Sequence, residues 1–243
     1  MPSLEDLAPA FILGFFAIGL VLERVFAARP LPKVRGWWLR ASISFVSTIA
    51  VNAIVPALVA ERFAALSLFQ LRSWGTVAGA GVALVCSDFA GYWLHRAQHR
   101  SPAFWRWTHQ MHHSAERVDV IGAAYFHPLD IAVQGVVSTA VVALLGVTPT
   151  AAALAGIVGV LLAVFQHLNV RTPAWVGYLV QRPEGHSVHH ARGVHAYNYG
   201  NLALCDLLFG TFRNPREFST EAGFYEGASA RVGAMLLGRD IQA

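Results

Sequence analysis

Three short segments of the sequence are rich in histidine: HRAQH at 95–99, HQMHH at 109–113 and HSVHH at 186–190. The first has an i, i+4 spacing and the other two an i, i+3, i+4 spacing, so a helix would place each set on one face. Neutral imidazole is the commonest metal ligand in proteins. Eight imidazoles exceed what one tetrahedral or octahedral ion accepts. The spacing therefore predicts two metal ions, with the ligands His95, His99, His109, His112, His113, His186, His189 and His190.

Three of the eleven histidines lie outside these segments. His167 ends an apolar run and is a ninth candidate ligand. His127, in the sequence FHP, is a tenth, although a histidine before proline can simply mark the boundary of a helix. His195 is open to both interpretations, a further ligand or a packed side chain.

The composition is that of a membrane protein. Of the 243 residues, 55% are hydrophobic and 13% are charged, against about 25% charged residues in soluble domains. The mean hydropathy is +0.47. The net charge of +4 is modest and indicates basic cytoplasmic loops rather than binding to nucleic acid. The two cysteines, Cys86 and Cys205, lie among apolar residues and are predicted to be free thiols.

Apolar runs predict an all-α integral membrane protein. No charged residue occurs between Asp130 and Arg171, and a single helix of that length would extend about 60 Å, twice the thickness of a hydrocarbon core. The sequence GVTPT at 146–150 carries a turn signal in the middle of this run. We therefore expect five membrane spans, the last two forming a hairpin, at 9–27, 41–60, 73–94, 129–147 and 150–168.

Basic residues in the short loops predict the orientation. Arg29, Lys33, Arg35 and Arg40 follow the first span, which places this loop in the cytoplasm. Residues 95–128 and 167–243 then lie on the same cytoplasmic face and form a histidine-rich helical cap. The expected location is the inner membrane of a bacterium. The expected regions of the chain are amino-terminal spans at 1–84, a catalytic region at 85–215 and a carboxy-terminal cytoplasmic tail at 216–243.

Several motifs around the histidines resemble the fatty acid hydroxylase superfamily, also called the sterol desaturase family. DFAGYWLHRAQH at 88–99 and FWRWTHQMHHSAE at 104–116 are similar to the first two histidine boxes of that family. YFHPLD at 125–130 and FQHLNV at 165–170 resemble its His-Pro and its isolated later histidine. RPEGHSVHH at 182–190 resembles the carboxy-terminal box of the family. NYGN at 198–201 and DLLFGTF at 206–212 resemble the segment after that box.

This resemblance implies a non-haem di-iron oxygenase that uses O2 to hydroxylate or desaturate a C–H bond of a lipid or sterol-like substrate from the bilayer. It implies two iron ions held by His95, His99, His109, His112, His113, His127, His167, His186, His189 and His190. Some family members have a second histidine four residues after the isolated one, where this chain has Arg171. That coordination position is left to His127, His195 or a water molecule.

Residues beyond the ligands are predicted from their place in the sequence. Histidine ligands are usually held by acceptors, and the candidates near the boxes are Asp88, Glu116, Asp119, Glu184 and Asp206. The sequence contains no dinucleotide-binding, cysteine-cluster or haem-attachment motif. Electrons are therefore expected from a separate ferredoxin, cytochrome or reductase.

Two other classes of protein and a second kind of substrate are alternatives to this interpretation. A histidine-lined metal transporter would need ligands in the middle of its spans, whereas these histidines lie at span ends and in loops. A membrane zinc hydrolase would need His-Glu-x-x-His, which is absent. A carotenoid or another apolar small molecule remains an alternative substrate within the oxygenase interpretation.

Overall fold

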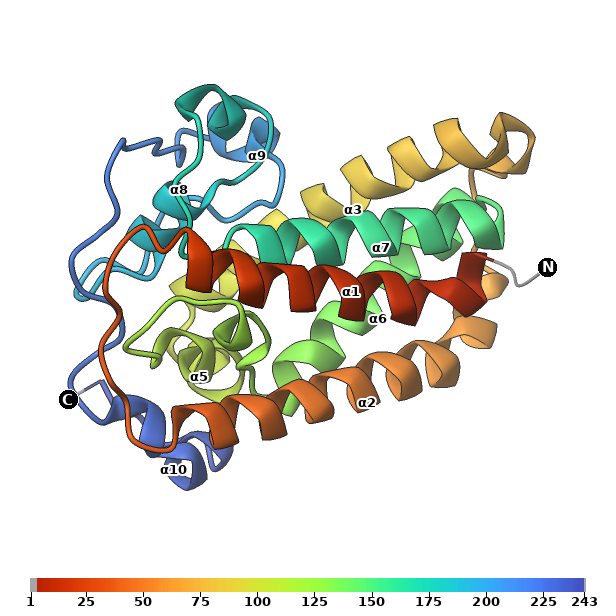
Figure 1. Ribbon diagram of the computed structural model, residues 1–243. Helices are drawn as coiled ribbons and strands as arrows, with labels where there is room; N and C mark the ends of the chain where they lie inside the picture. Colours follow the sequence, from red (N-terminus) through yellow and green to blue (C-terminus); the bar gives the residue numbers. More distant parts are fainter. Residues whose placement is uncertain (1–3, 243) are drawn as a thin grey trace.

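The computed structural model describes residues 4–242. Among these residues helices are the regular secondary structure, together with three isolated β-bridges. The five longest helices run lengthwise through the molecule (Figure 1). Their bounds are α1 Leu4–Val25, α2 Trp37–Ala64, α3 Gly75–Arg100, α6 Pro128–Leu145 and α7 Pro149–Phe165. The prediction of an all-α protein is confirmed for the described part of the chain.

Four helical segments are long and apolar enough to cross a membrane: Asp6–Val25, Trp37–Phe63, Leu71–Arg100 and Pro128–Leu145. The outer face of α2 exposes large apolar side chains such as Leu39 (67% exposed) and Leu58 (68%), as expected of a surface that faces lipid. The fifth predicted span forms α7, which is apolar but has 17 residues. That length gives about 25 Å of helix against a hydrocarbon core of about 30 Å, so the count of five stays a prediction.

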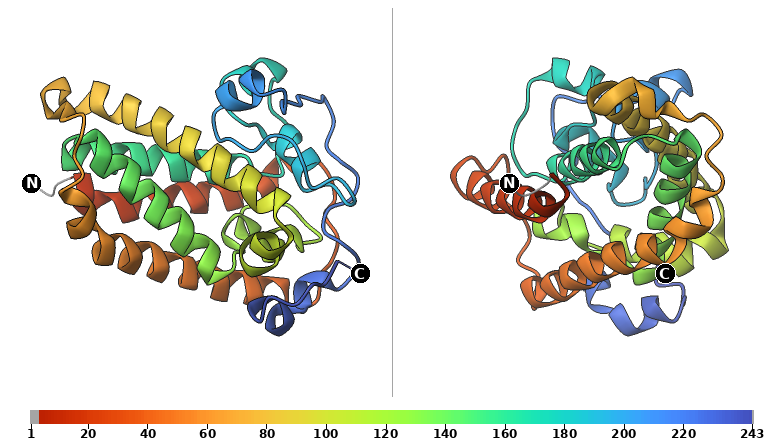
Figure 2. Two further views of the ribbon diagram at one scale, coloured as in Figure 1. Left: turned by 180° about the vertical axis from the view of Figure 1, so that it is seen from behind. Right: turned by 90° about the vertical axis from the view of Figure 1, so that its right-hand side faces the viewer.

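The predicted turn at 146–150 is present between α6 and α7. Gly146, with φ 61°, ends α6 in the left-handed region that glycine adopts without cost. Thr148 caps α7 by accepting a hydrogen bond from the backbone N–H of Ala151, and Pro149 follows at the first helical position. The two arms do not form a closely packed hairpin, however. Both pack along α3, while α2 packs on α6 and α1 packs on α7 (Figure 2).

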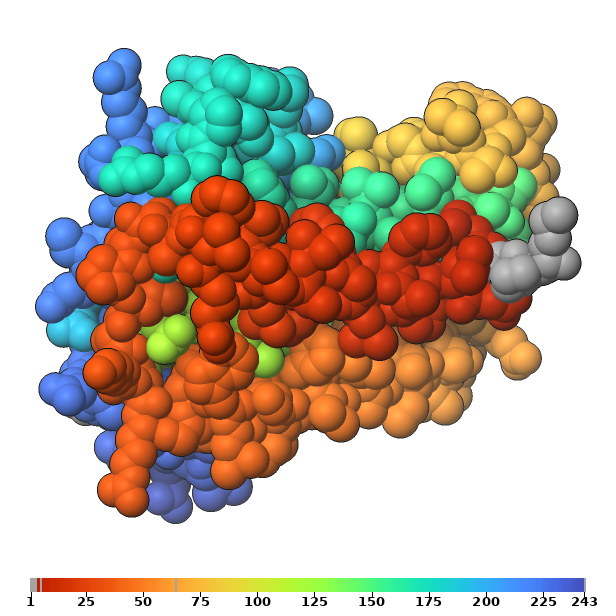
Figure 3. All heavy atoms as spheres, in the orientation of Figure 1, coloured from red at the N-terminus to blue at the C-terminus, as the bar shows by residue number. Residues whose placement is uncertain are grey.

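The short elements gather at one end of the bundle and form the cap, apart from η1 (Leu71–Trp74), which precedes α3 at the other end (Figures 1 and 2). In the space-filling view, the loop between α1 and α2 lies across the cap and leaves little of the segment around α5 visible (Figure 3). The cap elements are α4 Pro102–Phe104, η2 Trp105–His109, α5 Gln110–His113, η3 Ile121–Ala124, η4 Ala174–Tyr178, α8 Pro183–His189, α9 Ala203–Leu208, η5 Ala228–Ala230 and α10 Val232–Leu236.

The carboxy-terminal segment belongs to the packed cap. Met235 and Ile241 are almost fully buried and share one apolar core with Trp37 at the start of α2 and with Met111 of α5. This packing joins the end of the chain to the segments that carry the histidines. The division of the chain into regions at 84/85 and 215/216 stays a prediction.

Candidate metal centre

Nine of the ten predicted ligands converge into two groups in the cap. In each group, one ring nitrogen from every histidine lies within 4.8 Å of the others. We name the groups by their size. The five-histidine cluster consists of His95, His99, His109, His113 and His189, and the four-histidine cluster consists of His112, His167, His186 and His190.

The structure divides both HxxHH motifs between the clusters, although their spacing alone suggested one shared face for each. In the second motif His109 and His113 enter the five-histidine cluster, while His112 enters the four-histidine cluster. A π-helical turn at Trp105–His109 precedes the short helix α5, and such turns are frequent at functional sites. In the third motif His189 joins the five-histidine cluster, whereas His186 and His190 join the other. Each motif therefore connects the two clusters.

The imidazoles in the cap are held in their neutral form. Burial lowers the pKa of His109, His112 and His113 well below the ordinary value, and the neighbouring histidines lower it further. The same two causes lower the pKa of His189 and His190. Neutral imidazole is the form that binds a metal ion, so the environment prepares these side chains for coordination.

The hydrogen bonds of the rings show where the lone pairs point. His95 Nδ1 lies 2.8 Å from the backbone oxygen of Tyr199, and a carbonyl only accepts, so this nitrogen carries the hydrogen. His109 Nδ1 lies 2.7 Å from Asp130 Oδ2 in the same way. Their Nε2 atoms therefore carry lone pairs, and these atoms face each other at 2.8 Å. Two lone pairs at this distance repel each other unless a cation lies against both.

The four-histidine cluster has the same character. His167 donates from Nδ1 to the backbone oxygen of Ala163 at 2.7 Å. Its Nε2 lies 3.2 Å from Nε2 of His112 and 3.2 Å from Nε2 of His186. The nine-imidazole donor set, without a carboxylate, fits iron, zinc, copper or nickel and not magnesium or calcium. The residues present therefore fit the predicted metal pair.

The strongest acceptor for a ligating ring is a residue that the sequence reasoning missed. Asp130 is fully buried, and its Oδ2 accepts the hydrogen of His109 Nδ1. Its Oδ1 accepts hydrogen bonds from the side-chain amides of Gln98 (2.7 Å) and Gln134 (2.9 Å). The signal that points to it is its place in YFHPLD, three residues after His127.

None of the five acidic residues proposed as acceptors bonds a histidine ring in the described structure; each organises backbone or another side chain instead. Asp206 accepts from the N–H groups of Tyr199 and Gly200, and Asp88 accepts from those of Asn201 and Leu202. The other three bind elsewhere in the cap: Glu116 with Ser229, Asp119 with Trp37, Arg117 and Gly122, and Glu184 with Thr172 and Arg182.

The structure does not bring His127 into either cluster. Its Nδ1 accepts a hydrogen bond from the backbone N–H of Leu129, which makes it the cap of α6. His195 lies beside the five-histidine cluster: its Nδ1 is 3.1 Å from His113 Nδ1, and its backbone oxygen is 2.8 Å from His99 Nδ1. The structure thus separates the two residues proposed for the open coordination position.

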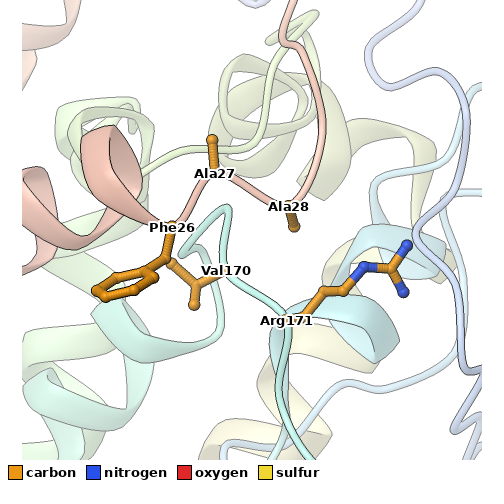
Figure 4. A pocket seen from close by; sticks show the side chains of 5 residues that line it. All are labelled: Phe26, Ala27, Ala28, Val170 and Arg171. Carbon is orange, nitrogen blue, oxygen red and sulfur yellow. The ribbon is translucent and has the colours of Figure 1, made fainter.

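A surface pocket of about 390 Å³ lies between the end of α1 and the segment that follows His167 (Figure 4). Phe26, Ala27, Ala28, Val170 and Arg171 line it. No histidine lines this pocket, and the Arg171 side chain is bound to Glu217. The pocket is therefore a feature of the cap surface and not of the clusters.

Comparison with known proteins places this site in a family. A family model described as fatty acid hydroxylase matches residues 80–211. The ornithine lipid hydroxylase OlsE of Rhizobium tropici is 32% identical over 163 residues, which cover 65% of this chain and 49% of that protein. This chain thus spans about half the length of that relative. No solved structure matches.

A second relative matches over most of its length. The very-long-chain aldehyde decarbonylase GL1-9 of Oryza sativa subsp. indica is 26% identical over 235 residues, which cover 86% of this chain and 88% of that protein. The family match takes in more than half of the chain and contains both histidine clusters. The predicted resemblance to the fatty acid hydroxylase superfamily is confirmed. The chain belongs to the fatty acid hydroxylase family.

Proposed function

We propose that this chain is a membrane di-iron enzyme that uses O2 to hydroxylate or desaturate a C–H bond of a lipid. The observation that carries the proposal is the pair of adjacent clusters, whose neutral imidazoles present unshared lone pairs toward one another. Two iron ions bound there would supply the reduction of O2 and the removal of hydrogen from an unactivated carbon. Nine imidazoles are the ligands: the five-histidine cluster would hold one ion and the four-histidine cluster the other.

The protein around the clusters binds, orients and excludes water. Asp130 and backbone carbonyls fix the hydrogens on Nδ1 of the ligands, which keeps Nε2 free for coordination. The Phe126 ring stacks on His112 at 4.0 Å between centroids, and Trp105 packs against His99 at 4.8 Å. These apolar walls keep bulk water from the rings and suit a hydrocarbon substrate.

The substrate class follows from the relatives and from the membrane. A lipid such as an ornithine lipid is favoured because OlsE is 32% identical to this chain over 163 residues. A long-chain aldehyde is the second candidate, because the aldehyde decarbonylase matches nearly the whole chain. The substrate would enter from the bilayer, and the cap would face the cytoplasm, as the basic loop at 29–40 indicates. Electrons would come from a separate ferredoxin, cytochrome or reductase.

Lipid analysis of cells supplied with isotopically labelled O2 tests this proposal. A bacterial host that expresses the chain should contain a lipid with a labelled hydroxyl group or a new double bond, absent from cells that express His112→Ala. A shortened hydrocarbon made from a long-chain aldehyde would favour the second candidate. An iron-loaded protein that changes no lipid and no aldehyde, with electrons supplied by a ferredoxin and its reductase, would contradict the proposal.

A further inference from the structure

Three ligands of the five-histidine cluster are held by alternate carbonyls of one segment, residues 195–199. The backbone oxygen of His195 accepts from His99 Nδ1 at 2.8 Å. The backbone oxygen of Tyr197 accepts from His189 Nδ1 at 2.7 Å. The backbone oxygen of Tyr199 accepts from His95 Nδ1 at 2.8 Å. One short loop therefore fixes both the tautomer and the orientation of three imidazoles.

This loop adopts a conformation that its sequence would not choose by itself. His195, Tyr197 and Asn198 have φ values of 40°, 70° and 50°, in the left-handed region that non-glycine residues seldom occupy. Such strain persists only where the surroundings enforce it. The Asn198 side chain donates to the backbone oxygens of Gly185 and Arg213 and accepts from the N–H of Arg213. Asn198 thus clamps the loop to α8 and to the segment at 211–213.

The two remaining rings of the five-histidine cluster are held as well. His109 donates to the Asp130 carboxylate, and His113 Nδ1 lies 3.1 Å from the ring of His195. Every ligand of this cluster therefore has a hydrogen-bond partner on Nδ1. Each of these contacts is made to a group outside the four-histidine cluster.

The four-histidine cluster is held less completely. His167 donates to a carbonyl of its own helix segment at 2.7 Å, but the contact of His112 Nδ1 with the backbone oxygen of Tyr125 is long, at 3.4 Å. The buried Nδ1 atoms of His186 and His190 have no hydrogen-bond partner among residues 4–242. In half of these rings, therefore, no hydrogen bond on Nδ1 fixes the tautomer before a metal ion binds.

We infer that the two metal positions are unequal, and that residues 195–199 are the positioning segment that makes the five-histidine cluster the tighter one. A ring that is already fixed loses little freedom on binding, and acceptors on Nδ1 make Nε2 more basic. The five-histidine cluster should bind first and release its ion last. This inference rests on the metal binding proposed above, but not on the metal's redox chemistry or on the substrate.

Anaerobic titration of the chelator-stripped full chain with Fe(II) against a competing chelator tests the inference. Two binding steps are expected, with dissociation constants at least about tenfold apart, the low end of the range for changes around a metal's ligands. Two equal steps would overturn the inference while leaving the proposed function intact. An absence of Fe(II) binding would instead overturn the proposed function.

Ligand variants assign the steps. His186→Ala removes a ligand of the four-histidine cluster and should leave the tight step, whereas His189→Ala should leave only the weak step. The opposite assignment would overturn the inference. These two variants decide the question even where a loop variant does not fold.

Loop variants then test the positioning segment. Asn198→Ala removes the clamp, and Asn198→Gly removes it while permitting the left-handed backbone. Both should weaken the tight step about 10- to 100-fold and leave the weak step unchanged. Asn214→Ala is the matched control, because Asn214 binds Arg182 and the backbone oxygen of Ala174 instead of the loop. Equal weakening of both steps, or the same effect in the control, would show a general effect on folding and would overturn the role of the segment.

Discussion

Replacing Asp130 with asparagine should prevent His109 from binding a metal ion, although His109 itself is unchanged. Gln98 and Gln134 both donate to Oδ1 of Asp130, so an asparagine would keep its amide oxygen at that position. Its NH2 group would then take the place of Oδ2 and donate to His109 Nδ1. His109 would have to carry its hydrogen on Nε2, the atom that faces the five-histidine cluster, and a protonated Nε2 does not coordinate a metal ion.

The size of the effect follows from the hydrogen bonds at stake. If the asparagine amide instead rotated by about 180°, its oxygen would still accept from His109 Nδ1. The buried amide donors of Gln98 and Gln134 would then face an NH2 group and lose their acceptor. Each buried hydrogen bond is worth about 1–1.5 kcal/mol net, so restoring the ligand costs about 2–3 kcal/mol. At 1.4 kcal/mol for each factor of ten, Fe(II) binding at the five-histidine cluster should weaken about 30- to 150-fold.

Chelator competition on the purified protein measures this change, and X-ray absorption should show one imidazole fewer at that ion. Asp119→Asn is the matched control, because Asp119 is 1% exposed, against 0% for Asp130, but binds Trp37 and Arg117 and no histidine. Wild-type affinity in Asp130→Asn, or an equal loss in Asp119→Asn, would refute the tautomer argument.

Three further outcomes are expected. His112→Ala and His189→Ala should each abolish oxidation while the protein still inserts into the membrane, and full activity in either variant, assayed by lipid analysis, would contradict its assignment as a ligand. Gly146→Ala should lower the free energy of unfolding by about 1–3 kcal/mol, because φ is 61° and a Cβ would collide with Ser67 Oγ. Denaturant titration in detergent measures this loss. An unchanged midpoint would contradict the left-handed turn at Gly146. Cys205 is 3% exposed and burial raises the pKa of its thiol to about 11. Iodoacetamide at pH 8 should therefore label this thiol only after unfolding. Rapid labelling of the folded protein, detected by mass spectrometry, would show that Cys205 in α9 is accessible to solvent.

The spacing within the three histidine segments was enough to predict eight of the nine ring positions that the structure brings together, because i, i+3 and i+4 spacings survive in even one turn of helix. The ninth, His167, was predicted from its place at the end of an apolar run. The turn at Gly146 was predictable for the same reason, since its chemistry is local. The division of each HxxHH motif between two clusters was not, because it depends on the π-helical turn at Trp105–His109 and on how α5 and α8 pack against α3.

The hydrogen-bond partners of the histidine rings could not be predicted from the sequence. A carboxylate partner such as Asp130 can be recognised in the sequence by its residue type, but the sequence does not give its distance from a histidine ring. The carbonyls of residues 195–199 leave no signal at all, because every residue has one and their direction is set by left-handed φ values at histidine, tyrosine and asparagine. The acidic residues near the boxes were better explained as anchors of backbone N–H groups, as Asp206 and Asp88 are.

The central claim is that the two clusters hold a pair of iron ions. Iron content and Mössbauer spectra of protein produced in iron-57-enriched medium without added zinc test it most directly, because zinc competes well for imidazole sites. We predict two irons per chain that are magnetically coupled when oxidised. A protein that carries no iron, or a single uncoupled ion, would contradict the claim.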